Sequence, residues 1–173
     1  MPQSIKPPAA CKPHELENFK AMLLASEQEG EDGLDQRIEQ AELLAFYYDN
    51  SKKLAAIAAL KHTNEGYLKG VFKKAGIPER NAVYPLEFGW FHILGEYRRK
   101  GILVSLLQRL LERSGGQAIF ATVRLSDQEM ATGLTQQGFV LSGEPYSRRD
   151  HRYKYQVYLR EAAAGQDKDL VAS

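Results

Sequence analysis

The sequence predicts an α/β fold, with a mixed sheet and helices packed on its faces. Three observations predict it: a β-hairpin signature, a βαβ unit, and apolar residues that recur at helical spacing. The hairpin consists of two short apolar runs, 43–48 and 54–60, that flank a polar turn over 49–52. The second run is rich enough in alanine for a helix, but its short length and the preceding turn favour a strand.

The βαβ unit lies in the middle of the chain. An aromatic, β-rich run over 86–94 precedes a strongly amphipathic helix over 97–114, and a short buried strand follows over 118–123. Such a crossover makes its two strands parallel and is almost always right-handed. A parallel pair next to a hairpin predicts the mixed sheet.

The remaining elements follow from the spacing of apolar residues. Further helices are expected over 13–23, 34–41, 68–75 and 126–137. Further strands are expected over 139–142 and 152–160. The proline-rich segment 1–12 is expected to be irregular, with room for one short strand, and 161–173 is expected to be a disordered tail. Because no repeat or linker divides the chain, residues 13–160 are predicted to form a single domain.

Composition narrows the classes of function. With 43% hydrophobic residues, 26% charged residues and a net charge of +1, the chain can bury a core but has no general attraction for nucleic acid or anionic membrane. Cys11 is the one cysteine, which fits a reducing compartment. No apolar run has the length of a membrane span or of a signal peptide, and the four histidines show no zinc spacing. These features predict a cytoplasmic protein without a metal site.

The segment 96–104, Glu-Tyr-Arg-Arg-Lys-Gly-Ile-Leu-Val, is the most informative motif. A helix N-terminus carries unpaired N–H groups and the positive end of the helix dipole, so it favours an anion. Gly101 would let a ligand approach the backbone, and Arg98, Arg99 and Lys100 add positive charge, so a diphosphate is the natural ligand. The segment matches neither a P-loop nor a dinucleotide fingerprint. The alternative is a solvated basic loop in which Gly101 only begins the helix.

This order of elements, with Gly138-Phe139 after the helix expected over 126–137, resembles the GNAT superfamily of N-acetyltransferases over roughly residues 13–160. In that family Arg/Gln-x-x-Gly-x-Gly/Ala binds the pyrophosphate of CoA, and the matching residues here are Arg98, Gly101 and Leu103. The run 46–61 also looks like a hairpin of the family. The resemblance implies a GNAT-like mixed, mostly antiparallel sheet with a central parallel βαβ unit and helices on both faces. It implies acetyl-CoA as the co-substrate.

The resemblance also implies the residues that contact CoA. Backbone groups at the end of the central strand would pair with pantetheine like an added strand. The implied contact residues are Phe91, His92, Ile93, Arg98, Arg99, Lys100, Gly101, Leu103, Val104 and Asp127. Leu103 departs from the family's small residue, and Asp127 stands where Asn is frequent. Leu134 occupies the position of a Tyr that often protonates the leaving thiolate.

Candidates for acid and base catalysis lie elsewhere in the chain. Glu87 opens the central strand, where the family often has an acidic base, and its alternative role is a surface glutamate in an ordinary ion pair. Tyr146, in the loop expected before the last strand, could donate a proton, or could be a rim residue. His92 could titrate near the thioester or be a packed histidine. Tyr67 and Tyr84 are weaker candidates of the same kind as Tyr146.

Two charged segments bear on the acceptor. The acidic loop 29–35 could favour a cationic amine, and the basic run 148–154 could attract an acidic acceptor, a phosphate or the 3′-phosphate of CoA. Each could equally be a solvated loop.

The leading hypothesis is an acyltransferase, an acetyl-CoA-dependent N-acetyltransferase that acts on a primary amine and does not transfer aminoacyl groups. The alternatives are another acyl group or acceptor, or a non-catalytic module that binds and senses acyl-CoA. A homodimer is a further expectation, because the sheet has exposed edges.

Overall fold

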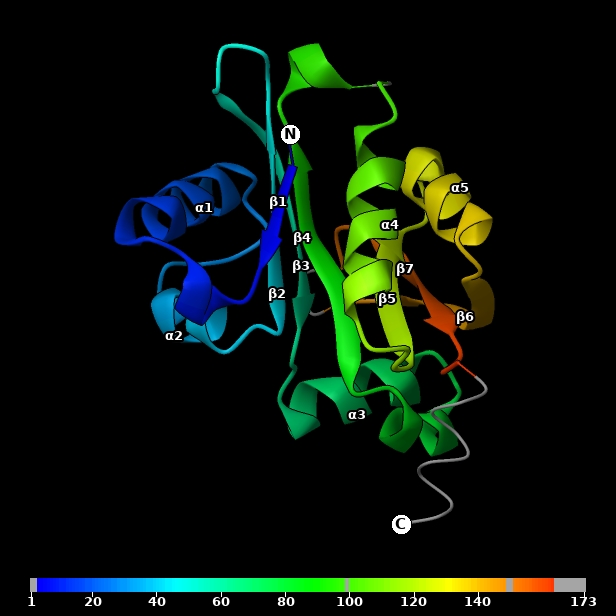
Figure 1. Cartoon of the computed structure of the whole chain (residues 1–173). Helices are drawn as coiled ribbons and strands as arrows, with labels where there is room; N and C mark the ends of the chain where they lie inside the picture. Colours follow the sequence, from blue (N-terminus) through cyan, green and yellow to red (C-terminus); the bar gives the residue numbers. More distant parts are fainter. Residues whose placement is uncertain (1–2, 99, 149–150, 164–173) are drawn as a thin grey trace. The chain divides into compact units, whose positions relative to one another are not determined.

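The computed structural model describes residues 3–98, 100–148 and 151–163. Its contacts divide the chain into two compact units. Unit 1 comprises residues 1–62 and 88–110, and unit 2 comprises residues 63–87 and 111–173. Strand β4 (Leu86–Ile93) begins in unit 2 and continues in unit 1 (Figure 1). Helix α4 (Ile102–Arg113) begins in unit 1 and ends in unit 2.

The strand order is β1-β2-β3-β4-β5-β7-β6. The pairs β1–β2, β2–β3, β5–β7 and β6–β7 are antiparallel, and β4 pairs with β5 in parallel. The predicted fold class, a mixed and mostly antiparallel sheet with a central βαβ unit, is therefore confirmed. Among the described residues, no helix combines the length and the apolar character needed to cross a bilayer.

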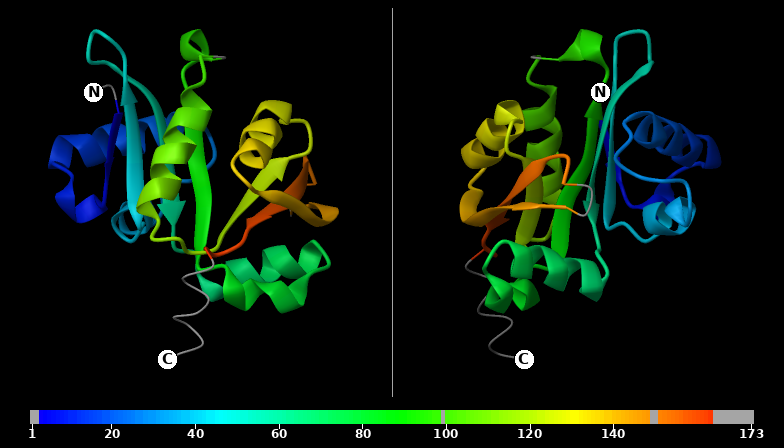
Figure 2. Two further views of the ribbon diagram at one scale, coloured as in Figure 1. Left: turned by 45° about the vertical axis from the view of Figure 1, so that its right-hand side comes forward. Right: turned by 180° about the vertical axis from the view of Figure 1, so that it is seen from behind.

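Unit 1 packs two helices against a three-stranded antiparallel arrangement and the second part of β4. Its other elements are β1 (Gln3–Lys6), a 3-10 helix (Pro8–Ala10), α1 (Pro13–Ala25), α2 (Leu34–Glu39), β2 (Leu43–Tyr48) and β3 (Leu54–Lys61). In Figures 1 and 2, α1 and α2 lie on the opposite side of β1, β2 and β3 from α4. Segment 1–12 was expected to be irregular with at most one short strand, and β1 is that strand.

Strand alternation builds the core of unit 1. Phe46 in β2 and Ile57 in β3 are fully buried, and they share a cluster with Phe19 and Leu23 of α1. Trp90 of β4 joins the same cluster, with its ring edge-to-face with that of Phe19. The predicted hairpin of 43–48 and 54–60 is confirmed, because both runs present alternate apolar side chains to these helices.

Unit 2 places helices on both sides of β5, β7 and β6 (Figure 2). Its elements are α3 (Glu65–Lys74), a 3-10 helix (Pro78–Val83), β5 (Ile119–Arg124), α5 (Gln128–Gln136), β6 (Val140–Ser147) and β7 (Lys154–Arg160). Phe72 of α3 packs edge-to-face on Phe120 of β5, and Tyr155, Val157 and Leu159 of β7 complete the same cluster. The strand predicted over 152–160 is confirmed as β7.

The structure corrects two predicted boundaries. The helix predicted to begin at Tyr97 begins at Ile102, because Gly95–Tyr97 forms a 3-10 helix and Arg98 is extended. The strand predicted over 139–142 continues to Ser147. Of the tail predicted over 161–173, residues 164–173 lie outside the described residues.

Candidate functional site

The start of α4 exposes backbone N–H groups. Gly101 precedes the helix with φ of +72°, a conformation that L side chains rarely adopt. A Cβ at this position would meet no atom within 4 Å, so the space beside the backbone is open. The amides of Ile102, Leu103 and Val104 occupy the first turn, where no carbonyl four residues earlier can accept from them. Leu103 turns its side chain inward and is 5% exposed, so only its backbone is available to a ligand.

Contacts within unit 1 hold the segment before α4. The Tyr97 hydroxyl donates to the Asp49 carboxylate in the turn between β2 and β3. This hydrogen bond holds the pKa of Asp49 well below its usual range and raises the pKa of Tyr97 to about 12. Lys53 of the same turn lies 3.6 Å from the Glu96 carboxylate. Lys100, which is exposed, lies over the Tyr97 ring at 5.3 Å from its centroid.

Two of the three predicted basic residues are described. Arg98 and Lys100 are exposed at the start of α4, as a phosphate-binding role requires. Arg99 lies outside the described residues.

Strand β4 is irregular where pantetheine was predicted to pair. Trp90 has φ of +55°, and Phe91, His92 and Ile93 follow it as partly buried residues. The amide of Leu94 donates to the carbonyl of Ala55 in β3 at 3.0 Å. Because successive residues of a strand direct their backbone groups to alternate edges, those of Phe91 lie on the edge away from β3.

The carbonyl of Phe91 accepts a hydrogen bond from the side-chain amide of Gln28 at 2.8 Å. Gln28 lies in the loop between α1 and α2, which is thereby attached to β4. Burial and the charge of Arg98 lower the pKa of His92, so its imidazole is neutral near pH 7. A neutral imidazole on this strand fits a packed histidine.

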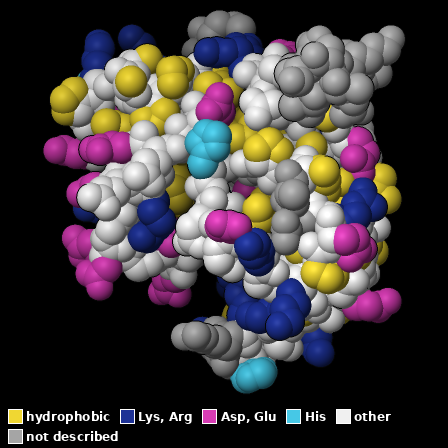
Figure 3. Space-filling model, turned by 90° about the horizontal axis from the view of Figure 1, so that it is seen from below, with side chains coloured by type: hydrophobic (Ala, Val, Ile, Leu, Met, Phe, Trp, Pro, Cys, Tyr) yellow, Lys and Arg dark blue, Asp and Glu magenta, His cyan; other side chains and the backbone are white. Residues whose placement is uncertain are grey.

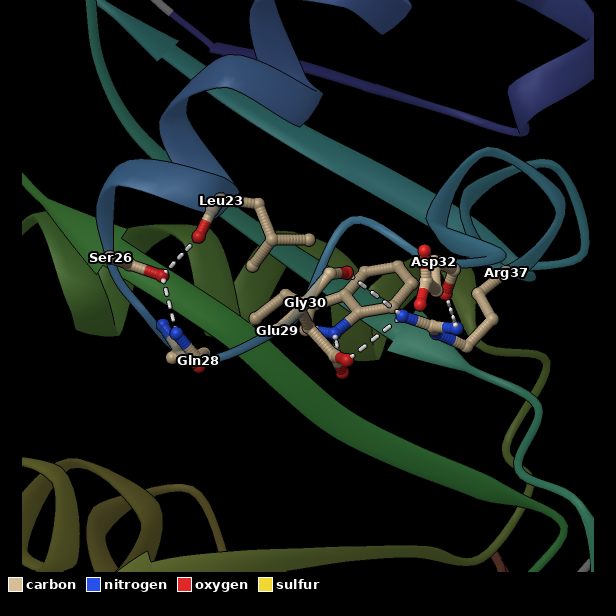
Figure 4. A network of polar contacts seen from close by, with 8 residues as sticks. Leu23, Ser26, Gln28, Glu29, Gly30, Asp32 and Arg37 are labelled. Carbon is tan, nitrogen blue, oxygen red and sulfur yellow. Dashed lines mark hydrogen bonds and ion pairs between the residues drawn. The ribbon is translucent and has the colours of Figure 1, made fainter.

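Figure 4 shows the loop between α1 and α2, in which Glu29 is fully engaged. Its carboxylate accepts from the Trp90 indole N–H at 2.9 Å and pairs with Arg37 at 3.1 Å. Arg37 also donates to the carbonyl of Asp32 at 2.8 Å. Asp35 pairs with Lys20 of α1 at 3.0 Å. Half of the acidic loop that was expected to attract an amine therefore pairs with cations of its own unit.

In unit 2, sheet register brings the two predicted catalytic residues to one face. Glu87 pairs with Phe120 across the parallel β4–β5 contact, and Tyr146 pairs with Tyr155 across β6–β7. Thr122 follows Phe120 by two positions and therefore lies on the same face. Since Phe120 and Tyr155 both pack in the cluster under α3, this is the face that α3 covers.

Glu87 is 2% exposed and accepts a hydrogen bond from the Tyr67 hydroxyl of α3 at 3.2 Å. The interpretation of Glu87 as a surface glutamate is therefore wrong, because α3 and β5 enclose it. Tyr67 is 36% exposed, while its hydroxyl bonds to the buried Glu87. Burial and the neighbouring Glu87 carboxylate raise the pKa of Tyr67 far above its ordinary value, so this hydroxyl keeps its proton.

Tyr146 lies in β6 and not in a loop, and it is 6% exposed. Its hydroxyl has no hydrogen-bond partner among the described residues. Burial raises the pKa of Tyr146 to about 12, against the opposing charge of Arg148. A protonated hydroxyl in this position can donate a proton or a hydrogen bond. Tyr84, the other weak candidate, instead binds Arg80 at 2.7 Å.

Arg148 is a described basic residue that contacts this cluster. Its guanidinium lies 3.8 Å from the Tyr155 ring centroid, and one of its N–H groups donates to the Thr122 hydroxyl at 3.3 Å. Figure 3 shows Lys and Arg side chains gathered in one group at the lower edge of that view. Of the run 148–154, Arg152 is exposed and stacks near Tyr153.

Asp127 and Leu134 both belong to α5. Asp127 is the N-cap of this helix, and its carboxylate accepts from the Met130 amide at 3.1 Å. Leu134 is fully buried and offers no proton donor, as predicted. Within the part of the chain that the structure describes, no three His, Cys, Asp or Glu side chains are grouped to hold a metal ion.

Sequence reasoning assigned no role to Gln28, Trp90 and Thr122, and a minor one to Tyr67. Only the fold places these residues beside predicted ones, because each contact joins segments more than 20 positions apart or crosses a strand register. One signal in the sequence could have pointed to this cluster: Thr122 is a polar residue in the otherwise apolar strand predicted over 118–123.

No family model and no curated protein matches the sequence. Solved structures do match over almost the whole chain. A GNAT superfamily phosphinothricin acetyltransferase from Sinorhizobium meliloti, solved with acetyl-CoA, matches with a TM-score of 0.68 and 13% identity, over 94% of this chain and 90% of its own. An acyl-CoA N-acyltransferase from Pseudomonas aeruginosa matches with a TM-score of 0.65 and 14% identity, over 91% and 97%. A spermidine N-acetyltransferase from Vibrio cholerae matches with a TM-score of 0.61 and 15% identity, over 91% and 94%. The chain therefore has the fold of the GNAT N-acetyltransferases.

Proposed function

We propose that this protein is an acetyl-CoA-dependent N-acetyltransferase that transfers the acetyl group directly to a primary amine. The observation that carries the proposal is the open backbone at Gly101, which begins α4 in a GNAT fold with Arg98 and Lys100 exposed beside it. Backbone amides and cations at a helix N-terminus stabilise the charge of a diphosphate. Acetyl-CoA carries that diphosphate.

Strand β4 supplies the second part of the proposed site. The backbone of Phe91 lies on the edge away from β3, so an extended pantetheine could add to this edge by main-chain hydrogen bonds. The Gln28 side-chain amide donates a hydrogen bond to the Phe91 carbonyl. When pantetheine binds, this hydrogen bond would be shared or broken. Asp127 has a structural role as an N-cap, and we propose contact with pantetheine only for its exposed face.

In the proposed reaction, Glu87 is the general base and Tyr146 the general acid. Glu87 takes a proton from the ammonium of the acceptor, and the amine nitrogen attacks the thioester carbonyl. The C–N bond forms, the C–S bond breaks, and the thiolate leaves with a proton from the Tyr146 hydroxyl. The attacking nitrogen then gives its second proton to the Tyr146 oxygen, which restores the phenol and leaves the neutral amide. Tyr67 holds the Glu87 carboxylate by its hydrogen bond of 3.2 Å, so Tyr67 acts as a positioning residue.

A non-catalytic acyl-CoA-binding module is the second candidate. The burial of Leu134, which leaves the usual position of the proton donor apolar, favours it. The buried carboxylate of Glu87 with its Tyr67 partner favours the enzyme, because a module that only binds has no need of a buried base.

The test is thermal unfolding with and without acetyl-CoA. Ligand at about 100 times its dissociation constant stabilises the fold by about 2.7 kcal/mol, which for this size is a rise in Tm of roughly 5–10 °C. Arg98→Ala should weaken binding about tenfold through the loss of one charge-assisted hydrogen bond of about 1.5 kcal/mol. Thiol release in an amine screen then separates the enzyme from the module.

Gly101→Glu should abolish the acetyl-CoA shift, and Gly76→Glu is its matched control. Both glycines have positive φ, +72° and +78°, and an added Cβ at either meets no atom within 4 Å. Both variants should lose similar stability from backbone strain, but only Gly101→Glu places a carboxylate at the start of α4. The absence of a shift for the folded wild type at millimolar acetyl-CoA would overturn the proposal.

A further inference from the structure

Opposite charges share the α3-facing surface of the sheet in unit 2. The Glu87 carboxylate is 2% exposed, and the Arg148 guanidinium is partly buried against Tyr155. Both charges act on the hydroxyls of Tyr67 and Tyr146, so the four side chains form one electrostatic cluster. We name Tyr67, Glu87, Thr122, Tyr146 and Arg148 the polar cluster.

The Tyr146 hydroxyl is the first sign that the polar cluster receives a ligand. It is enclosed, since Tyr146 is only 6% exposed, and it has no hydrogen-bond partner among the described residues. A buried hydroxyl without a partner is destabilising, and native structures keep such groups where a ligand or water completes them. The Tyr146 hydroxyl keeps its proton, so it can donate a hydrogen bond to a ligand.

The Arg148 guanidinium is the second sign. Stacking on the Tyr155 ring at 3.8 Å holds its plane, and one of its N–H groups donates to the Thr122 hydroxyl at 3.3 Å. A guanidinium presents five N–H donors in a rigid fork, and that fork matches a carboxylate with two parallel hydrogen bonds. Most of the fork of Arg148 is therefore available to an anionic group.

We propose that the acceptor is a zwitterion of the amino-acid type, with its ammonium bound by Glu87 and its carboxylate bound by Arg148. The assignment rests on the proposed function, because it identifies the acceptor of that reaction. An anionic base and a cation in one cluster complement both charges of such a molecule, whereas a simple amine would offer Arg148 no anionic group. Glu87, in contact with the ammonium, is then in place to remove its proton.

The first experiment compares L-amino acids with the corresponding amides, which keep the amine and lose the carboxylate. Thermal unfolding is recorded with each compound, in the presence and in the absence of CoA. The best amino acid should raise Tm and bind at least tenfold more tightly than its amide. Equal binding of the two, or no binding of any amino acid, overturns the proposal.

The second experiment uses Arg148→Gln, with Arg152→Gln as the control for charge. Arg152 is exposed in the same segment and also lies over a tyrosine ring, that of Tyr153 at 5.3 Å. Arg148→Gln should abolish the preference for the acid over the amide, and Arg152→Gln should keep it. If Arg148→Gln does not fold, the comparison of acids and amides on the wild type still decides.

Two further outcomes have defined meanings. If Arg148→Gln weakens the binding of CoA but not of dephospho-CoA, Arg148 binds the 3′-phosphate of CoA and the zwitterion assignment is wrong. If amino acids bind through Arg148 but no thiol is released from acetyl-CoA, the zwitterion site stands and the proposed acetyl transfer fails. If thiol is released but amides are preferred to amino acids, the proposed acetyl transfer stands and the zwitterion site fails.

Discussion

At the scale of single residues, Glu87 shows how the fold changes the chemistry of a side chain. A glutamate at the end of a strand is ordinarily solvated, but here α3 covers it and Tyr67 donates to it. A carboxylate that lies in a buried cluster has lost much of its hydration, so a cationic amine is its natural partner.

Glu87→Gln should therefore reduce turnover by about 10²- to 10⁴-fold, the usual contribution of a general base. The side chain keeps its size and can still accept from Tyr67, so the rise in Tm with acetyl-CoA should persist. Steady-state thiol release and thermal unfolding measure the two effects. Glu79→Gln, at an exposed position of unit 2, is the control and should change neither. Unchanged turnover of Glu87→Gln means that the base is another group.

Tyr146 predicts a dependence of stability on alkaline pH. Its pKa is raised to about 12 in the folded state, mainly by burial, whereas an unfolded tyrosine titrates near 10. The folded state thus binds the proton more tightly, so this contribution is complete below about pH 10 and is lost as pH rises toward 12. Tyr146→Phe should flatten that loss, as measured by unfolding between pH 9 and 12 in roughly half-unit steps. If the stability of Tyr146→Phe falls as steeply with pH as that of the wild type, the loss comes from other tyrosines.

At the scale of elements, local signals predicted some boundaries well. The hairpin of β2 and β3 was predictable because its turn residues and its two apolar runs are contiguous in sequence. The start of α4 was not, because the apolar spacing of a helix does not reveal that Gly101 has left-handed backbone. Tyr146 was expected in a loop, but β6 continues past Gly143 and Pro145, and Tyr146 pairs with Tyr155 of β7.

The candidate site was less predictable than the elements. The glycine and the cations at the start of α4 are adjacent in sequence, so the segment was found directly. The polar cluster depends on strand register and on α3, which joins Tyr67 to Glu87 across 20 positions. A single sequence shows no such pairing.

The loop between α1 and α2 gives a prediction at this scale. Glu29 joins Trp90 to Arg37, so Glu29→Gln weakens both contacts of the loop at once. The expected cost is about 1 kcal/mol, since the Glu29 side chain is 25% exposed and such pairs are partly screened. Amide hydrogen exchange of residues 27–33 should become faster while exchange in β2 stays slow. Glu31→Gln, at an exposed position of the same loop, should leave exchange unchanged; similar exchange in both variants would show that Glu29 does not anchor the loop.

At the scale of the whole molecule, the single domain predicted over 13–160 can be tested with one variant and two probes. Gly143 of β6 has φ of +70°, and an added Cβ would overlap the carbonyl oxygen of Ala75. Gly143→Ala should therefore destabilise unit 2 by about 1–3 kcal/mol, which lowers Tm by roughly 2–10 °C.

The one tryptophan, Trp90, lies in the core of unit 1 and reports on that unit alone. If the chain unfolds as one domain, tryptophan fluorescence and far-ultraviolet circular dichroism should give the same lowered Tm for Gly143→Ala. A fluorescence transition that stays at the wild-type temperature while the circular dichroism transition moves contradicts the single domain. The homodimer stays a prediction, which sedimentation of the same samples checks.

The hydrogen bond from Tyr97 to Asp49, together with the pairing of Lys53 and Glu96, has a consequence for the speed of binding. Both contacts join side chains of the protein itself, so residues 95–98 do not have to change shape when an anion arrives. Encounter should then limit association, with a rate constant of about 10⁶–10⁷ M⁻¹s⁻¹ that falls as salt screens Arg98 and Lys100. Tyr97→Phe would make the segment mobile, and stopped-flow mixing with CoA should then show a slower second phase that does not depend on salt.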